Sequence, residues 1–219
     1  MQIKADLHVH TTYSQDSMIT PRDLVFYAKK KGLTAVAVTD HNCVEGAVKI
    51  AKETDFLIIP GVEVDSIDGH IVGLNVKDII PRGLSAIETA ELIHAAGGIA
   101  VACHPYALFK GSLGRNVCAE FDAIEVINAR AFPFKRSVKK AKETAERLKL
   151  SRVAGTDAHY GPQVGYGYTV IDAELNVEAI MKAIVDGRCE AYGEPVPIFL
   201  NLRQQFQRLQ RLTKKLRSK

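Results

Sequence analysis

The fold of this chain is indicated by residues 35–41, which read Ala35-Val36-Ala37-Val38-Thr39-Asp40-His41. Four apolar residues in succession are typical of a short strand that is buried on both faces, as in the parallel sheets of α/β proteins. An acid and a histidine follow directly where this strand is expected to end. The chain repeats this arrangement, an apolar run followed by histidine or carboxylate, from one end to the other.

Five further short motifs place histidine or carboxylate in the same way. They are His8-Val9-His10, Gly61-Val62-Glu63, Gly69-His70, His104-Pro105 and Gly155-Thr156-Asp157-Ala158-His159. Histidine and carboxylate are the ligands that zinc, manganese and iron favour. A core histidine placed by chance has no reason to recur after successive apolar runs. The pattern therefore predicts a multinuclear metal site, and with it a hydrolase.

Apolar β-rich runs alternate with amphipathic helical patterns along the chain. Thr20 and Asn42 are expected to cap two of the helices, and Ser85 with Glu88 forms a capping box that opens a third. Such alternation predicts a parallel α/β architecture. Strands are expected at about residues 3–8, 35–39, 56–60, 70–74, 99–103, 123–127, 152–155, 168–171 and 190–192, and helices at about 21–31, 42–53, 85–97, 135–149 and 177–186.

The metal-ligand candidates decide between an open sheet and a barrel, because they follow strand ends that are far apart in the sequence. In a closed barrel these ends share one rim, where (β/α) barrels hold their active sites. An open sheet would disperse them along an edge. We therefore expect a barrel over residues 1–195, and an irregular one, because clean βα units number nearer seven than eight.

Length and composition suit one domain with a well-filled core. The chain has 219 residues, 47% of them apolar and 25% charged, as in ordinary globular proteins. No stretch is apolar over the length that spans a bilayer, and the N-terminus has no secretory apolar region, so we expect a cytoplasmic protein. The four cysteines are scattered and are interpreted as reduced, small apolar residues: Cys43, Cys103, Cys118 and Cys189.

The positive charge of the chain is concentrated at its C-terminal end. The net charge is +4, but seven Lys or Arg and no acid lie between Arg203 and Lys219, so the remaining 22 basic residues face 25 acids. Apolar residues recur there at helical spacing: Leu202, Phe206, Leu209, Leu212 and Leu216. Residues 196–219 are therefore expected to form a basic amphipathic helix that packs on the barrel or on a second copy of the chain. Contact with nucleic acid or an anionic membrane is the alternative.

As an ordered set, the motifs resemble the polymerase and histidinol phosphatase (PHP) family of metal-dependent phosphoesterases. The resemblance covers roughly residues 5–170 and also includes Asp6, Thr11 and Thr39. It implies an α/β fold, a distorted TIM-like (β/α)7 barrel, with two or three divalent metals (zinc, manganese or iron) at the C-terminal rim of the strands.

The resemblance also implies a set of ligands. The first metal would be held by His8, His10, Glu63 and Asp157. Glu63 would bridge to a second metal held by His70 and His104, and Asp16, His41 and His159 would hold a third. Some members of the family have histidine where this chain has Asp16, a harder oxygen ligand, so the metal of the third site stays open. Asp6 and Asp40 flank ligands and are expected to orient them.

Closely spaced metals suit the hydrolysis of phosphate esters, with a metal-bound hydroxide as the nucleophile. Glu63 and Asp157 would then be catalytic through the metals. Arg130, after the apolar run 123–127, is expected to clamp phosphate and to act in catalysis, with a structural ion pair as the alternative. Lys110 and Arg115 lie in the long loop 105–122, a candidate substrate lid, and are expected to bind substrate unless they are solvated surface charges.

The leading hypothesis is a phosphomonoesterase or nucleotidase acting on a phosphorylated small molecule or nucleotide. A nuclease-like phosphodiesterase acting on nucleic-acid ends is favoured by the basic C-terminal segment and disfavoured by the slightly acidic body. A histidinol-phosphatase-type enzyme and a non-catalytic metal-binding accessory protein stay open. An amidohydrolase is disfavoured, because Glu63 occupies the bridging position.

Overall fold

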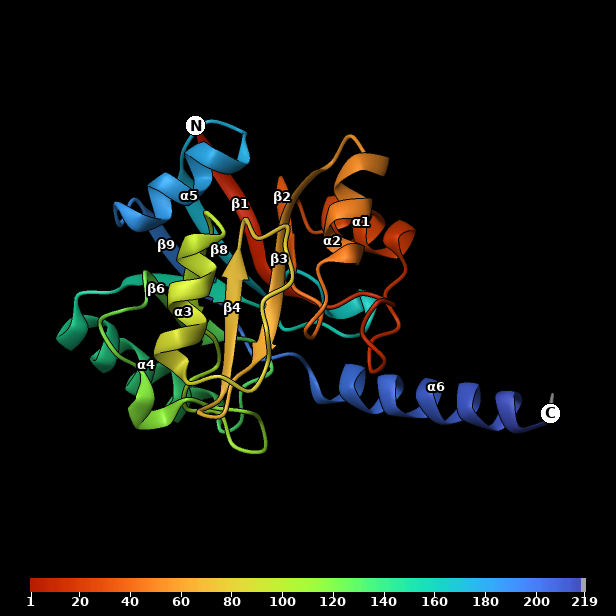
Figure 1. Cartoon of the computed structure of the whole chain (residues 1–219). Coiled ribbons are helices and arrows are strands. Elements are labelled where there is room, and N and C mark those ends of the chain that lie inside the picture. Colours follow the sequence, from red (N-terminus) through yellow and green to blue (C-terminus); the bar gives the residue numbers. More distant parts are fainter. Residues whose placement is uncertain (218–219) are drawn as a thin grey trace.

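The computed structural model describes the backbone of residues 1–217 and the side chains of those residues except Leu212 and residues 214–217. Nine strands of the described chain form one sheet that is rolled into a nearly closed barrel, and helices lie around its outside (Figure 1). The strands are β1 (Gln2–Val9), β2 (Ala35–Val38), β3 (Leu57–Asp65), β4 (His70–Leu74), β5 (Ile99–Ala102), β6 (Ala123–Asn128), β7 (Ser151–Gly155), β8 (Gly167–Asp172) and β9 (Cys189–Gly193). The helices are α1 (Pro21–Lys30), α2 (Glu45–Glu53), α3 (Ala86–Ala95), α4 (Phe134–Leu148), α5 (Val177–Val185) and α6 (Ile198–Arg217), with short 3-10 turns η1 (Gly114–Asn116) and η2 (Gly161–Gln163).

The barrel closes between β1 and the segment that follows β7. The strand order is β7-β6-β5-β4-β3-β2-β1-β8-β9. Beyond β7, the Asp157 N–H donates to the His8 carbonyl at 2.7 Å, and the His10 N–H donates to the Ala158 carbonyl at 2.9 Å. The closing hydrogen bonds therefore join two of the histidine motifs at one rim.

The predicted TIM-like barrel is confirmed, but the expectation of a parallel sheet is wrong for two strands. β4 runs antiparallel to β3 and β5, and β8 runs antiparallel to β1 and β9. Only residues 66–69 join β3 to β4, and a connection of this length allows a hairpin but not a parallel crossover. All nine expected strands form, but β8 and β9 extend the sheet beyond β1, so the sheet has two strands more than a (β/α)7 barrel.

Local capping signals mark the starts of α1 and α3. Thr20 caps α1 and shares a capping box with Asp23, and Ser85 does the same for α3 with Glu88, as predicted. The prediction for Asn42 is wrong, because α2 begins at Glu45. Asn42 instead has φ of +51°, and its amide pairs with Asp65, donating to Oδ2 at 2.8 Å and accepting from the backbone N–H at 3.0 Å. It ties the loop after β2 to the end of β3.

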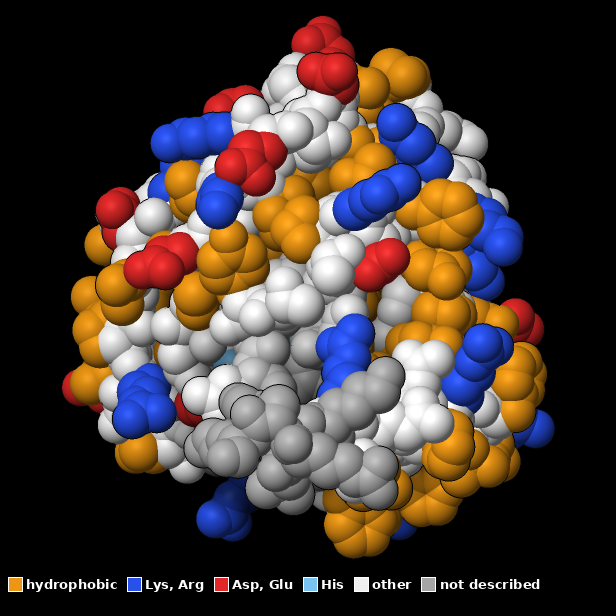
Figure 2. Space-filling model, turned by 90° about the vertical axis from the view of Figure 1, so that its right-hand side faces the viewer, with side chains coloured by type: hydrophobic (Ala, Val, Ile, Leu, Met, Phe, Trp, Pro, Cys, Tyr) orange, Lys and Arg blue, Asp and Glu red, His pale blue; other side chains and the backbone are white. Residues whose placement is uncertain are grey.

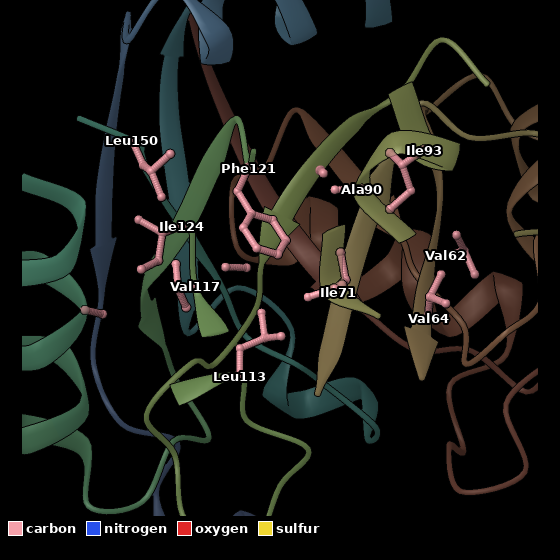
Figure 3. Packing of buried hydrophobic residues seen from close by; sticks show 14 of the residues in the cluster. Val62, Val64, Ile71, Ala90, Ile93, Leu113, Val117, Phe121, Ile124 and Leu150 are labelled. Atoms are coloured by element: carbon pink, nitrogen blue, oxygen red, sulfur yellow. The ribbon is translucent and has the colours of Figure 1, made fainter. Parts of the chain in front are cut away.

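The loop between β5 and β6 is half buried and half exposed. Leu113, Val117 and Phe121 point into an apolar cluster that also contains Ile71 and Ile93 (Figure 3). Burial of such side chains contributes about 2 kcal/mol each, so the second half of the loop is firmly anchored. Leu108 and Phe109, near its tip, are exposed.

α6 packs on the barrel only through its first turns and then projects from it (Figure 1). Leu200 and Gln204 are buried, and the Gln163 amide donates to Asn201 and Gln204 at 2.9 Å each. The predicted apolar stripe is exposed at Leu202, Phe206 and Leu209, whereas the side chains of Leu212 and Leu216 lie outside the described residues. Figure 2 shows this side of the molecule, where apolar and basic side chains both reach the surface.

Two further features are the state of the cysteines and the character of the helices. The four cysteines are free, as predicted. Among the described helices, none has the length and apolar character needed to cross a membrane.

Candidate metal centre

The nine predicted metal ligands converge on the rim where the barrel closes. β1 supplies His8 and is followed directly by His10, the loop after β2 supplies His41, β3 supplies Glu63 and β4 begins with His70. The remaining ligands follow strands too: His104 after β5, Asp157 and His159 after β7, and Asp16 in the loop between β1 and α1. Several groups of three lie close enough together to hold one ion, such as His8, His10 and Glu63, and Glu63, His70 and His104.

Glu63 lies at the centre, and its two oxygens face different histidines. Oε2 is 3.1 Å from His10 Nε2, 3.3 Å from His41 Nδ1 and 3.4 Å from His8 Nε2. Oε1 is 2.8 Å from His104 Nε2 and 2.9 Å from His70 Nδ1. Burial alone would raise the pKa of Glu63, but the histidines around it hold that pKa well below its usual value. The carboxylate is therefore ionised and placed as a bridge between two groups of imidazoles.

Two further carboxylates, Asp16 and Asp157, define the other side of the centre. Asp16 Oδ2 is 2.9 Å from His159 Nε2 and 3.7 Å from His41 Nε2. Asp157 Oδ1 is 3.4 Å from His159 Nδ1 and 3.5 Å from His10 Nε2. Burial opposes charge on Asp16, yet the neighbouring His159 lowers its pKa below the usual range. Asp157 has φ of +60°, a left-handed conformation that is uncommon for residues other than glycine.

The donor set fits divalent cations. His8 Nε2 and His10 Nε2 face each other at 3.2 Å, so two hydrogen-bond acceptors meet unless a proton or a cation lies between them. Burial lowers the pKa of His104 to about 4 and that of His159 well below its usual value, which leaves both imidazoles neutral. The buried atoms Asp16 Oδ1 and His104 Nδ1 find no hydrogen-bond partner among the described residues. Neutral imidazoles and ionised carboxylates packed together are the ligands of a transition-metal centre.

Asp6 and Asp40 hold backbone near the ligands and touch no imidazole in the described contacts. Asp40 accepts the Thr11 N–H and hydroxyl at 2.6 Å each and the Ser14 hydroxyl at 2.8 Å. Asp6 accepts the Thr156 N–H at 2.8 Å and the Gly165 N–H at 2.9 Å, and burial raises the pKa of Asp6 to about 6. Both carboxylates therefore hold, by hydrogen bonds, the backbone segments that carry the ligands.

Sequence reasoning missed Glu125, which contacts two of the ligands. Its Oε1 is 3.3 Å from His8 Nδ1, on the side of the ring that faces away from Glu63, and its Oε2 accepts the His104 N–H at 2.7 Å and the Asn128 amide at 2.9 Å. A carboxylate behind a ligating histidine fixes the tautomer and orientation of the ring. One signal was present in the sequence: Glu125 is the single charged residue in the buried strand β6.

Two of the three predicted substrate-binding cations reach the centre. Arg130 Nη1 donates to the Asp157 carbonyl at 2.9 Å and lies 2.6 Å from His159 Nδ1, and the Lys110 ammonium contacts Asp157 Oδ2. Burial, together with Arg130, lowers the pKa of Lys110 to about 8. Arg115 is exposed on η1 and does not line the cavity, because the anchored half of its loop turns it to the surface.

A cavity of about 420 Å³ opens over the centre. Its walls combine ligand candidates, both cations and one aromatic ring: Asp16, His41, Glu63, His70, His104, Phe109, Lys110, Gly111, Arg130, Asp157 and His159. His8 and His10 lie beneath it, fully buried. The site can therefore admit a small anionic ligand against the histidine and carboxylate cluster.

The family model of the PHP domain matches residues 6–213. An uncharacterized protein of Methanocaldococcus jannaschii is 41% identical over 141 residues, 58% of this chain and 82% of that protein. A 5′-3′ exoribonuclease of Haemophilus influenzae is 34% identical over 100 residues, 42% of this chain and 36% of that enzyme.

Among solved structures, a two-domain protein from Bacteroides vulgatus that contains a predicted PHP-like metal-dependent phosphoesterase has a TM-score of 0.70 at 20% identity. The match covers 89% of this chain and 65% of that one, so this chain spans about two thirds of its length. At this identity the likeness is one of fold.

Proposed function

The chain belongs to the PHP domain family, and from this premise we propose that it hydrolyses phosphate monoesters of small molecules or nucleotides with the help of two or three divalent metals. One observation carries the proposal. The buried Glu63 presents each of its oxygens to a different set of histidines at the floor of a cavity that also holds Lys110 and Arg130. A carboxylate that can bridge two metals, beside cations that can bind phosphate, suits the metal-assisted hydrolysis of a phosphate ester.

In this proposal the ligands divide into three groups. His8, His10, Glu63 and Asp157 would hold one ion, Glu63 with His70 and His104 would hold the second, and Asp16, His41 and His159 would hold the third. Zinc, manganese and iron all suit such donors. When bound, the ions supply a nucleophile from water near neutral pH and neutralise charge on the attacking and departing oxygens.

The chain's own cations bind and orient the phosphate. Arg130 uses Nη1 for Asp157 and His159, and a guanidinium has further N–H donors that can take a phosphate oxygen. Lys110 is protonated below pH 8 and contacts Asp157 from the cavity wall. We propose that both donate to phosphate oxygens and that Arg130 also stabilises the charge that develops during hydrolysis.

The size of the site favours a small substrate. A cavity of about 420 Å³ lies within the range of small-molecule sites. The body outside residues 203–219 is slightly acidic, which is unfavourable for a long polyanion. We therefore rank a phosphomonoesterase or nucleotidase first.

A nuclease acting on nucleic-acid ends is the second candidate. It is supported by the likeness to an exoribonuclease and by the exposed Arg203, Arg208 and Arg211 on α6. Residues 196–219 would then form a basic segment beside the barrel of residues 1–195. Turnover should fall steeply with salt in this case, because binding to a phosphate backbone releases counterions.

The test is a hydrolysis screen of protein reconstituted with manganese, zinc or iron. The substrates are nucleoside monophosphates, sugar phosphates, glycerol 2-phosphate and RNA with a labelled 5′ end. We expect metal-dependent release of inorganic phosphate that changes little with salt. Shortening of RNA with a steep salt dependence would favour the nuclease instead. If none of these substrates is hydrolysed with any of the three metals, both candidates are refuted.

A further inference from the structure

Phe109 is an exposed aromatic residue at the mouth of the metal cavity. Its side chain is 94% exposed, yet it lines the same cavity as Glu63, His70 and Lys110. We propose that Phe109 is a stacking platform for the base of a nucleoside phosphate whose phosphate group occupies the centre. This inference rests on the proposed function and names its substrate class.

The backbone at Phe109 is costly for this residue. Its φ is +61°, a left-handed conformation that costs roughly 1–2 kcal/mol for residues other than glycine. Glycine would satisfy the turn at lower cost, and a polar residue would suit a side chain in solvent. A phenyl ring held there gains nothing from folding, because its surface stays in water. The ring gains apolar contact only when a ligand covers it.

The chain is held in place on both sides of Phe109. Before it, the Leu108 N–H donates to the Phe132 carbonyl at 2.7 Å. After it, Lys110 contacts Asp157, and the His70 N–H donates to the Gly111 carbonyl at 2.7 Å. A β-carbon on Gly111 would lie 2.2 Å from the His70 ring, so the loop approaches the metal centre as closely as glycine permits. The backbone that carries Phe109 is therefore fixed relative to the ligands, and a bound substrate would have to order only the side chain.

The two ends of the cavity select opposite chemistry. At the floor, Lys110 and Arg130 suit phosphate oxygens. At the mouth, Phe109 offers a flat apolar face, and the nearby Leu108 and Phe132 are also exposed. A ligand that matches both ends carries an anion at one end and a planar ring at the other, as a nucleoside phosphate does. Phe has no hydrogen-bonding group, so stacking on it would accept any base.

Replacement of Phe109 tests the proposal through substrate selectivity. We expect Phe109→Ala to lower kcat/KM for AMP and UMP by roughly 5- to 100-fold, the range of one lost base stack. Glycerol 2-phosphate, which has no ring, should change less than about twofold. Phe109→Trp should stay near wild type, and Phe109→Leu should resemble Phe109→Ala. Phe26→Ala is the matched control, because Phe26 is an exposed phenylalanine on α1, outside this cavity.

Three results would overturn the stacking proposal. These are an equal loss for nucleotides and glycerol 2-phosphate, full nucleotide turnover in Phe109→Leu, and no loss in Phe109→Ala. Calorimetric titration with AMP and with inorganic phosphate separates this proposal from the proposed function. Weaker AMP binding in Phe109→Ala with unchanged phosphate binding would support stacking even if no ester were hydrolysed, and equal AMP affinities would refute it.

Discussion

The rim of the barrel and the C-terminal helix both concentrate charge, but they do so in opposite ways. At the rim, His8 and Glu63 are almost fully buried and lie within 3.4 Å of each other. On α6, Arg203 and Arg208 are exposed. Buried charge is stable only when it is paired, whereas an exposed charge is satisfied by water. Rim residues should therefore depend on one another and on a cation, whereas residues of the projecting part of α6 should be replaceable one by one.

Glu63→Gln should give the largest effect. The amide keeps the shape of the side chain but cannot bridge two cations, so we expect turnover to fall about 1,000-fold or more, a loss of several kcal/mol of charge stabilisation. The measurement is phosphate release by the reconstituted protein, with circular dichroism as the check of folding. Glu53→Gln, on the exposed end of α2, is the control. If Glu63→Gln kept a tenth of normal activity, turnover would not depend on a carboxylate that bridges the metals, and this account of the rim would be contradicted.

Glu125→Gln should give the next effect. The neutral amide weakens the hold on His8 and on the His104 backbone, and loss of such a partner typically lowers metal affinity about 10- to 100-fold. Competition with a coloured chelator measures the affinity. Glu143→Gln, an exposed carboxylate on α4, should leave it unchanged. Equal affinities in wild type and Glu125→Gln would mean that the contact with His8 has no bearing on the metals.

Metal binding should also depend on pH with a defined sign. Burial disfavours charge on His8, but Glu63 and Glu125 outweigh it and raise the pKa of His8 to about 9 in the metal-free protein. A metal at His8 must displace this proton, so affinity should rise about tenfold per pH unit and level off near pH 9. Calorimetry in buffers of different ionisation enthalpy should find about one proton released at this group. Binding without proton release would contradict this account.

The smallest effect is expected at α6. Deletion of residues 205–219 keeps the buried Leu200 and Gln204, so the barrel should stay folded and turnover of a small phosphate ester should change less than about twofold. Sedimentation of both proteins tests whether α6 joins two copies, as its exposed apolar stripe suggests. A tenfold loss of turnover on deletion would contradict the claim that the projecting part of α6 is not needed by the rim.

The sequence predicted the rim better than it predicted the loops and strand directions. Ligands at or just after the C-terminal ends of strands must converge if the sheet closes, so the meeting of His8, Glu63 and Asp157 at one rim could be predicted from the motifs. The direction of β4 did not, because it depends on the short turn at residues 66–69. Asn42 was misread as a helix cap because its partner, Asp65, is distant in sequence.

Three residues show why the rest of the site was harder to predict. Glu125 lies inside an apolar strand and belongs to no spacing pattern. Arg115 was placed near the cavity because it shares a loop with Lys110, but burial of Leu113 and Val117 turns it to the surface. The position of Phe109 over the cavity depends on tertiary contacts of Leu108 and Gly111.

The central claim is that the histidine and carboxylate cluster at the rim binds divalent metals. Elemental analysis of protein reconstituted with manganese, zinc or iron and then dialysed tests it most directly. We predict two to three metal ions per chain in wild type and a clear reduction in Glu63→Gln. A wild-type protein that retains no ion after reconstitution with any of the three metals would contradict the account.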